Sequence, residues 1–155
     1  MTESAGPPSY LDEPSTPSFG GSGFGGESGN QENWSGRMPP QDTEAEQSVL
    51  GSMLISKDAI ADVLEVVKAH DFYKPAHETI YLAITDLYSR GEPADPVTVS
   101  AELSRRGELV RVGGAPYIHT LSASVPIAAN AGYYGEIVRE KSILRRLVEA
   151  GTKIA

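Results

Sequence analysis

The sequence of 155 residues contains no cysteine, which excludes disulfides, thiol catalysis and zinc sites built on cysteine. Long apolar runs are also missing, because the longest covers only residues 80–84, whereas a membrane-spanning helix needs about 20 apolar residues. The amino end lacks the basic segment followed by an apolar one that marks a signal peptide. We therefore expect a cytoplasmic protein that does not enter a membrane.

Positive charge is scarce as well. The chain has 13 Lys and Arg against 21 Asp and Glu, which gives a formal net charge of −8. Residues 1–40 hold five of the acids and one of the bases, so 16 acids and 12 bases remain for residues 41–155, and each part carries −4. Domains that bind nucleic acids are normally basic, so we expect direct DNA contact by this chain to be weak at most.

Catalytic motifs are missing too. The sequence has no Gly-Lys-Ser/Thr of a P-loop, no G-x-S-x-G elbow and no H-E-x-x-H zinc motif. Its histidines, His70, His77 and His119, are too dispersed for a local metal site, and a single histidine on a helix usually lies at the surface or its boundary. The acidic pair Glu44 and Glu46 is predicted to lie on a solvated helix face. We therefore predict no catalytic, cofactor-binding or metal-binding residue in this chain.

The amino-terminal segment, residues 1–41, has the composition of a disordered leader. Gly, Pro and Ser supply 21 of its first 40 residues, and such a segment cannot bury enough apolar surface to offset its chain entropy. A G-x-G-x-x-G pattern at residues 21–26 has no predicted strand before it and no helix after it, so we interpret it as a flexible tract.

A strongly amphipathic segment follows Pro75, which suits the first position of a helix because proline has no N–H to leave unpaired. Gly91 can end this helix in the left-handed conformation. The apolar residues recur at intervals of three and four, which is the helical period: they are Ala76, Ile80, Ala83, Ile84, Leu87 and Tyr88. We predict that this is the central helix of a small all-α domain.

Four further helices are predicted around it, giving a compact, orthogonal helical head of about five helices over residues 42–126. The first begins at Asp42 or Thr43, with a capping box formed by Thr43 and Glu46, and small residues at Gly51 and Ser52 permit close helix contact. The second begins near residues 56–58. Thr98 is predicted to cap the next helix, in which Arg105 and Arg106 complement the negative end of the dipole, and Gly113-Gly114 precedes the last.

The end of the chain, residues 127–155, has no proline and keeps a helical apolar period over more than twenty residues. It is locally basic, with five Lys and Arg against three Glu. No helix stop is recognisable at Ile154 and Ala155. We therefore predict one long helix that packs on something outside the head.

Several short motifs occur in a fixed order along the chain: Glu44-Ala45-Glu46-Gln47-Ser48-Val49-Leu50-Gly51-Ser52-Met53-Leu54, Asp71-Phe72-Tyr73 with His77 and Ile80-Tyr81, Gly113-Gly114-Ala115-Pro116-Tyr117-Ile118, Ala129-Asn130-Ala131-Gly132-Tyr133-Tyr134, and Ile137-Val138-Arg139-Glu140-Lys141 with Leu144-Arg145. Together they resemble the amino-terminal domain of bacterial replicative DNA helicases of the DnaB type. The resemblance covers residues 42–155 almost continuously, and the glycine-rich leader resembles those of actinobacterial members.

The resemblance implies a helical head followed by a helical hairpin, of which residues 127–155 would be the first arm, truncated before the second. In this family the hairpins pair, so that six subunits form a trimer-of-dimers collar on which the carboxy-terminal domain of primase docks. The ATPase motor, with its ATP and Mg, would lie outside this chain, and a helicase loader is a further expected partner. The predicted interface residues are Tyr133, Tyr134, Ile137, Arg139, Leu144, Arg145 and Val148.

Two other functions fit a helical chain of this kind. One is the helicase-binding domain of a primase, which has a similar helical design, and the other is a generic helical protein-interaction module. A small enzyme is disfavoured because no convergent catalytic set is present, so helicase activity is expected only of a longer parent protein.

Overall fold

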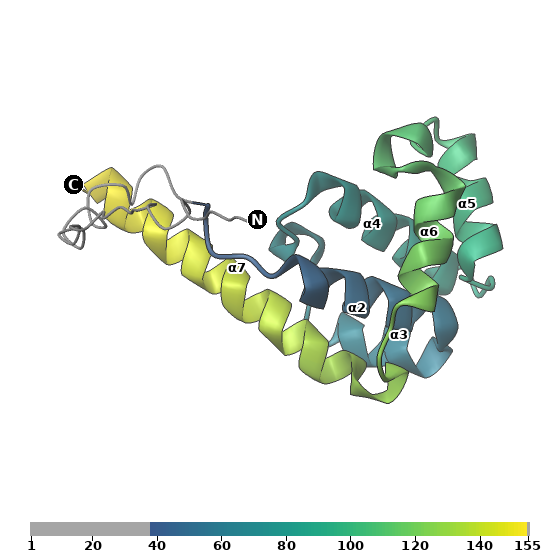
Figure 1. Ribbon diagram of the computed structural model, residues 1–155, viewed down its shortest axis with the longest axis horizontal. Helices are drawn as coiled ribbons and strands as arrows, with labels where there is room; N and C mark the ends of the chain where they lie inside the picture. Colours follow the sequence, from purple (N-terminus) through teal and green to yellow (C-terminus); the bar gives the residue numbers. More distant parts are fainter. Residues whose placement is uncertain (1–37, 155) are drawn as a thin grey trace, which may run out of the picture. The chain divides into compact units, whose positions relative to one another are not determined.

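The computed structural model describes residues 38–154, and these contain six α-helices and no strand. The predictions made for residues 1–37 lie outside the described residues. The helices, shown in Figure 1, are α2 (Thr43–Ile55), α3 (Lys57–Leu64), α4 (Pro75–Ser89), α5 (Pro96–Arg105), α6 (Gly114–Ala123) and α7 (Ala131–Ile154), joined in part by the short 3-10 helices η4 (Ala69–Asp71), η5 (Val110–Val112) and η6 (Ala128–Asn130). We call helices α2 to α6 the head.

The all-α fold class and the long final helix are confirmed. No helix between residues 38 and 154 is both long and apolar enough to cross a membrane. The predicted divisions of the chain after residues 41 and 126 stay predictions.

Helix α2 occupies the centre of the head, because it packs against α3, α4, α6 and α7. Its buried residues go round the whole helix: they are Ala45, Glu46, Val49, Leu50, Gly51, Ser52, Met53 and Leu54. A helix that is buried on all sides has no single apolar stripe. The prediction that α4 is the central helix is therefore wrong, and it failed because it relied on amphipathic periodicity, which marks a helix with one solvated face.

Close packing at Gly51 brings α2 against the end of α6. A Cβ atom at this position would overlap the carbonyl oxygen of Leu121 and a methyl group of Val125. The predicted use of a small residue for close helix contact is thus confirmed.

Helix α4 has the predicted bounds, with Pro75 in its first turn and Gly91 in the left-handed conformation at φ 76° just after its end. Its buried face includes the predicted Ile80, Ala83, Ile84 and Leu87 together with His77 and Tyr81. The Tyr81 hydroxyl donates to the Val67 carbonyl oxygen at 2.6 Å. Burial raises the pKa of Tyr81 to about 12.

Of the predicted helix caps, one is confirmed and one is wrong. Helix α2 is capped by Asp42, one of the two predicted residues, whose carboxylate accepts a hydrogen bond from the Ala45 N–H at 3.0 Å, but the predicted capping box between Thr43 and Glu46 does not form. Helix α5 is capped by Asp95 rather than Thr98, and the two side chains bond reciprocally to each other's N–H at 2.9 Å. An aspartate upstream of a threonine takes the cap position in both helices.

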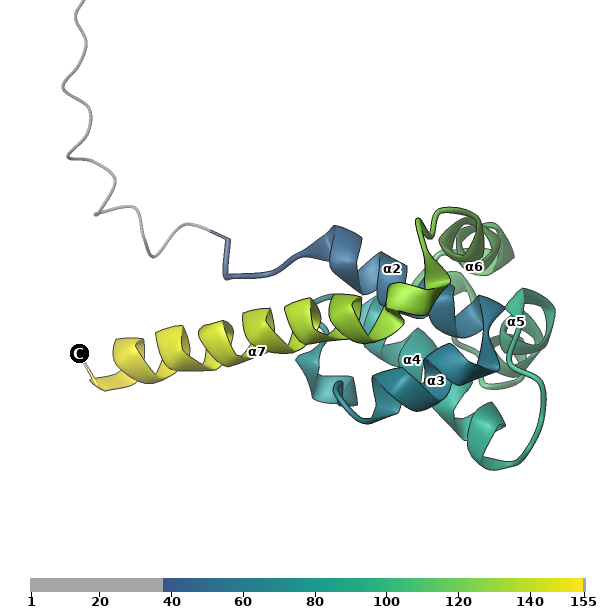
Figure 2. The ribbon, with the colours of Figure 1, turned by 90° about the horizontal axis from the view of Figure 1, so that it is seen from below.

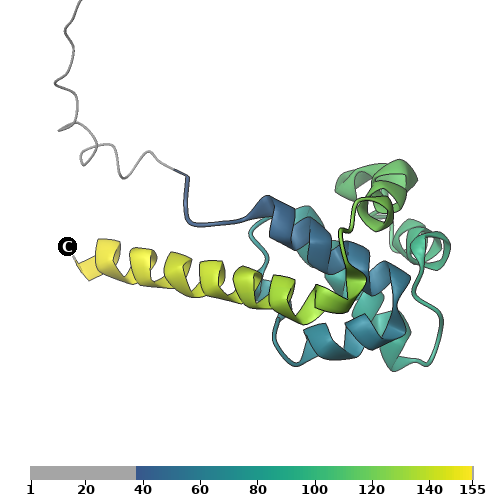
Figure 3. The ribbon, with the colours of Figure 1, turned by 60° about the horizontal axis from the view of Figure 1, so that its bottom comes forward.

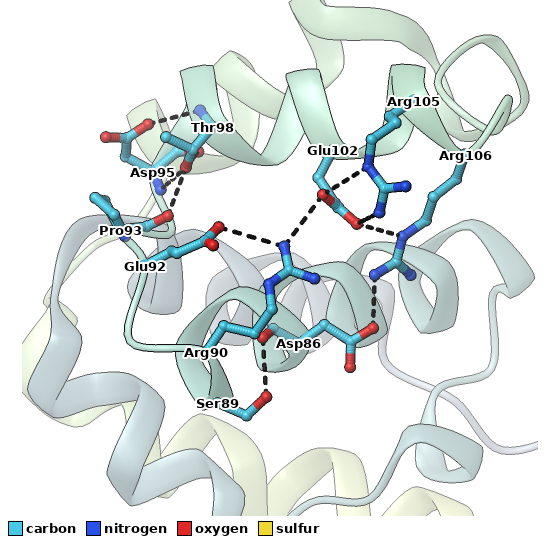
Figure 4. Close-up of polar contacts among 10 residues, drawn as sticks. All are labelled: Asp86, Ser89, Arg90, Glu92, Pro93, Asp95, Thr98, Glu102, Arg105 and Arg106. Atoms are coloured by element: carbon cyan, nitrogen blue, oxygen red, sulfur yellow. Dashed lines mark hydrogen bonds and ion pairs between the residues drawn. The ribbon is translucent and has the colours of Figure 1, made fainter.

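An ion-pair cluster joins the ends of α4 and α5 around Glu102, a side chain only 6% exposed (Figure 4). Arg90 reaches Glu102 at 3.3 Å, and Arg106 lies 2.8 Å from Glu102 and 2.6 Å from Asp86. Arg105 also binds Glu102. The two arginines predicted only to complement the helix dipole therefore act mainly as partners of one carboxylate.

This cluster makes stability depend on pH. Hydrogen bonds from Arg105 and Arg106 lower the pKa of Glu102 from 4.5 to about 2. The folded state thus prefers the ionised carboxylate, so its contribution is complete above the ordinary pKa and is lost as the pH falls toward 2. We expect Glu102→Gln to lower the free energy of unfolding near neutral pH, and the difference from the wild type to shrink between pH 4.5 and 2. Urea unfolding across this range would measure it, and parallel stability curves would contradict the assignment.

Candidate interaction surface on helix α7

One side of helix α7 is fixed to the head. Ala131, Gly135, Val138 and Ser142 are buried and recur at intervals of four and three, which places them on one face of the helix. This face packs on α2 and α3. Gly135 permits the close approach, because a Cβ atom there would lie 3.0 Å from Val67. Figures 2 and 3 show α7 running beside α2, with its carboxy-terminal half extending past the other helices.

The opposite side of α7 carries apolar side chains that remain wholly or partly exposed. Tyr133 is 71% exposed, Ile137 37% and Leu144 43%. With about 3.6 residues per turn, the steps of four and seven between them keep all three on one side, and Val148, which is half-buried, continues the row. We call these four residues the apolar stripe. All four belong to the predicted interface set.

Two apolar residues beside the stripe were missed by sequence reasoning. Ile143 is 40% exposed and Leu147 62%, and both flank the stripe in the carboxy-terminal half of α7. The sequence alone did not show which apolar residues of this helix are exposed and which are buried, so nothing in it marked these two as exposed.

The remaining predicted interface residues lie elsewhere. Tyr134 is half-buried and packs on the core, because it is turned by about 100° from Tyr133 along the helix. Arg139 is exposed. Arg145 binds its own chain, donating to the carbonyl oxygens of Pro40 at 2.9 Å and Asp71 at 2.6 Å. The structure thus brings four of the seven predicted residues into one surface, and the role of all seven in an interface stays a prediction.

A buried polar network lies inside the head, at residues that were predicted to be solvated or near the surface. Glu46 is 1% exposed and His77 is 0% exposed. The Glu46 carboxylate accepts from the Tyr73 N–H at 2.7 Å and lies 2.8 Å from His77 Nδ1, while His77 Nε2 lies 2.6 Å from the Tyr117 hydroxyl.

The predictions that Glu46 lies on a solvated face and that His77 lies at the surface or its boundary are therefore wrong. They failed because the partners are distant in sequence: Glu46 and His77 are 31 residues apart, and His77 and Tyr117 are 40 apart. The network links α2, α4 and α6, and its groups satisfy one another, so we assign it a structural role. Among residues 38–154 no group of three or more His, Asp and Glu is placed to hold a metal ion.

Comparison with known proteins decides the family. Residues 38–140 match the model of the DnaB-like helicase N terminal domain, which is more than half of the chain. The chain belongs to this family. The predicted resemblance to the DnaB type is confirmed, and the alternative of a primase's helicase-binding domain loses its support.

The relatives agree with this. The chain is 71% identical over 119 residues to the replicative DNA helicase DnaB of Mycobacterium leprae, covering 77% of this chain and 20% of the relative. It is 64% identical over 118 residues to the DnaB of Leifsonia xyli, covering 76% of this chain and 26% of the relative. The chain thus spans only about a fifth to a quarter of these curated relatives.

A solved structure has the same fold. The crystal structure of the N-terminal domain of DnaB helicase from Mycobacterium tuberculosis is 70% identical to this chain, with a TM-score of 0.75. The match covers 76% of this chain and 85% of the solved one. At this identity the shared fold and the shared family support each other.

Proposed function

We propose that this chain is the collar domain of a replicative DNA helicase, where it joins subunits to one another and docks the carboxy-terminal domain of primase. The named relatives are replicative DNA helicases. The observation that carries the proposal is the apolar stripe, three of whose four residues are exposed, along a helix that extends past its own head. A helix with apolar residues on two opposite sides is suited to lie between its own domain and a partner.

The energetics of the stripe are adequate for association. Burying apolar surface contributes about 25 cal/mol per Å², so several side chains of this size on each of two copies give several kcal/mol before the costs of association. Aromatic residues such as Tyr133 are enriched at protein interfaces because they bury a large area with few rotatable bonds. A pairing of two stripes would account for their exposure in the single chain.

Other parts of the helicase function belong to the whole protein. We infer that it works in the cytoplasm, that ATP and Mg bind a motor outside this chain, and that the motor makes the principal DNA contacts. A helicase loader is a further proposed partner of the assembled helicase. Within this chain the proposed role is thus assembly and recruitment, which support fork unwinding and primer synthesis.

The test is the mass of the chain in solution, measured by light scattering during size-exclusion chromatography. We expect the wild type to form dimers or larger species, and Ile137→Asp to give monomers because it places a charge in the paired stripes. Adding the carboxy-terminal domain of primase should give a mixed complex with the wild type. The thermal melting of the head should be the same in both proteins.

The matched control is Val97→Asp, which places the same charge on an apolar residue of α5 that is 67% exposed. It should assemble like the wild type. A wild-type chain that stays monomeric and does not bind primase would contradict the proposal, and so would an Ile137→Asp variant that assembles normally.

A further inference from the structure

We propose that Arg145 is a positioning residue, which fixes the direction in which helix α7 leaves the head. The contact itself does not depend on the proposed function. Its consequence for assembly does rest on it, because the direction of α7 sets where the apolar stripe is presented.

Arg145 makes three contacts with segments that are remote in the sequence. Its two terminal nitrogens donate to the carbonyl oxygens of Pro40, at 2.9 Å, and Asp71, at 2.6 Å. The centre of its guanidinium lies 5.4 Å from the centre of the Tyr73 ring, within the range of a cation–π contact. A planar guanidinium with several donors can satisfy these partners at the same time, whereas a lysine ammonium cannot reproduce that geometry.

A second contact between α7 and the same segment of the head lies one turn earlier on the helix. The Ser142 hydroxyl donates to Asp71 Oδ1 at 2.8 Å, and both side chains are almost fully buried, at 3% and 2% exposure. The other oxygen, Asp71 Oδ2, accepts from the Lys68 N–H at 2.8 Å. Asp71 therefore holds η4 and α7 together. We call Arg145, Ser142, Asp71, Tyr73 and the Pro40 carbonyl the clasp.

The clasp is supported from the centre of the head. The Tyr73 N–H donates to Glu46 Oε2 at 2.7 Å, and Glu46 is a buried residue of the central helix α2. The segment that receives Arg145 is thus tied to α2 by a carboxylate and cannot shift freely. A fixed receiving surface is what turns the Arg145 contacts into a constraint on the angle of α7.

Beyond Arg145 the contacts with the head are fewer: Arg146 lies 3.6 Å from Asp71 Oδ1, and Val148 is half-buried. Leu147, Glu149, Ala150 and Gly151 are all exposed, and the end of α7 extends past the other helices (Figures 1 and 2). At about 1.5 Å per residue, a small change of angle at Arg145 moves the end of α7 through a larger distance. Loss of the clasp should therefore spread the directions of α7 without unfolding the head.

The experiment measures the distance from the head to the end of α7. Because the chain has no cysteine, spin labels can be placed only where wanted, at Ala101→Cys on α5 and Ala150→Cys on α7, both exposed positions. Labelled chains are mixed with an excess of unlabelled chains, so that only distances within one chain are seen. Pulsed electron paramagnetic resonance then gives the distance distribution.

We expect one narrow distance peak in the wild type and a broader, shifted peak in Arg145→Ala, with the melting of the head retained. Arg145→Lys should restore the peak only in part, because a single ammonium group cannot bind both carbonyl oxygens and keep the cation–π contact with Tyr73. Arg139→Ala is the matched control, since Arg139 is an exposed arginine of the same helix. It should give the wild-type peak.

An Arg145→Ala peak as narrow as the wild type's would overturn the proposal, and so would equal broadening in Arg139→Ala. If Arg145→Ala does not melt cooperatively, the distance distributions of Arg145→Lys and Ser142→Ala are measured instead. The proposal requires both variants to give a broader peak than the wild type, and a peak of wild-type width in either would overturn it. The result is independent of assembly: a wild-type chain that is monomeric would contradict the collar function, yet the distance peak would still test the clasp.

Discussion

Replacing Ile84 by aspartate is expected to unfold the head. Ile84 is 0% exposed on α4, inside the core that α4 shares with α2. An unpaired carboxylate buried in apolar surroundings costs at least several kcal/mol, and domains of this size are stable by only about 5–15 kcal/mol. Thermal melting followed by far-ultraviolet circular dichroism should show no cooperative transition, or one at a much lower temperature.

The control for this change is on the same helix. Leu82→Asp introduces the same charge at a position that is 43% exposed, where water can solvate the carboxylate, and it should melt close to the wild type. A wild-type melting temperature for Ile84→Asp would show that α4 does not bury this face.

Adding a single methyl group at Gly51 is expected to destabilise the head strongly. In Gly51→Ala the new Cβ would overlap the Leu121 carbonyl oxygen and a Val125 methyl group. One of these is backbone, which cannot turn away as a side chain can, so α6 has to move off α2. Overpacking of this kind costs about 1–3 kcal/mol, and the backbone clash places this site at the upper end. Urea unfolding would measure the loss.

Gly132→Ala is the matched control for that experiment. Gly132 lies on α7, and a Cβ atom there meets no other group within 4 Å. Glycine is a poorer helix former than alanine by up to about 1 kcal/mol, so this change should be neutral or slightly stabilising. The same substitution is thus expected to act in opposite directions at the two sites, and equal effects would contradict the packing of α2 on α6.

Much of the head could be predicted from the sequence because the deciding signals are local. Pro75 and Gly91 bound α4, and the apolar period between them identified Ile80, Ile84 and Leu87 as core. Local signals failed for α2, where burial on all sides removes the period that would mark it as central. Thr98 was predicted as the cap of α5, whereas the structure places Asp95 at the cap, with Thr98 bonded reciprocally to it.

The polar contacts could not be predicted, since their partners are far apart in the chain. Glu46 binds the Tyr73 N–H across 27 residues, and Arg145 binds the Asp71 carbonyl across 74. Spacing within a helix carries no information on such pairs. For the same reason Arg145, an arginine on an amphipathic helix, was expected to face a partner and instead contacts its own chain. The apolar stripe could be predicted in part, because its helical period can be seen in the sequence. That Tyr134 belongs to the core and not to the stripe could be seen only once the structure showed which side of α7 faces the head.

The unequal support along α7 also gives the helix two levels of local stability. Residues 131–145 are held by packing on α2 and α3 and by Arg145, so their amide hydrogens open to solvent only when larger parts of the head unfold. The turns beyond have fewer contacts with the head, one of which joins Arg146 to Asp71 Oδ1 at 3.6 Å. We therefore expect the amide hydrogens of those turns to exchange faster than those of residues 131–145, and to exchange more slowly where another surface covers them, which makes hydrogen exchange at the end of α7 an indicator of whether a partner is bound.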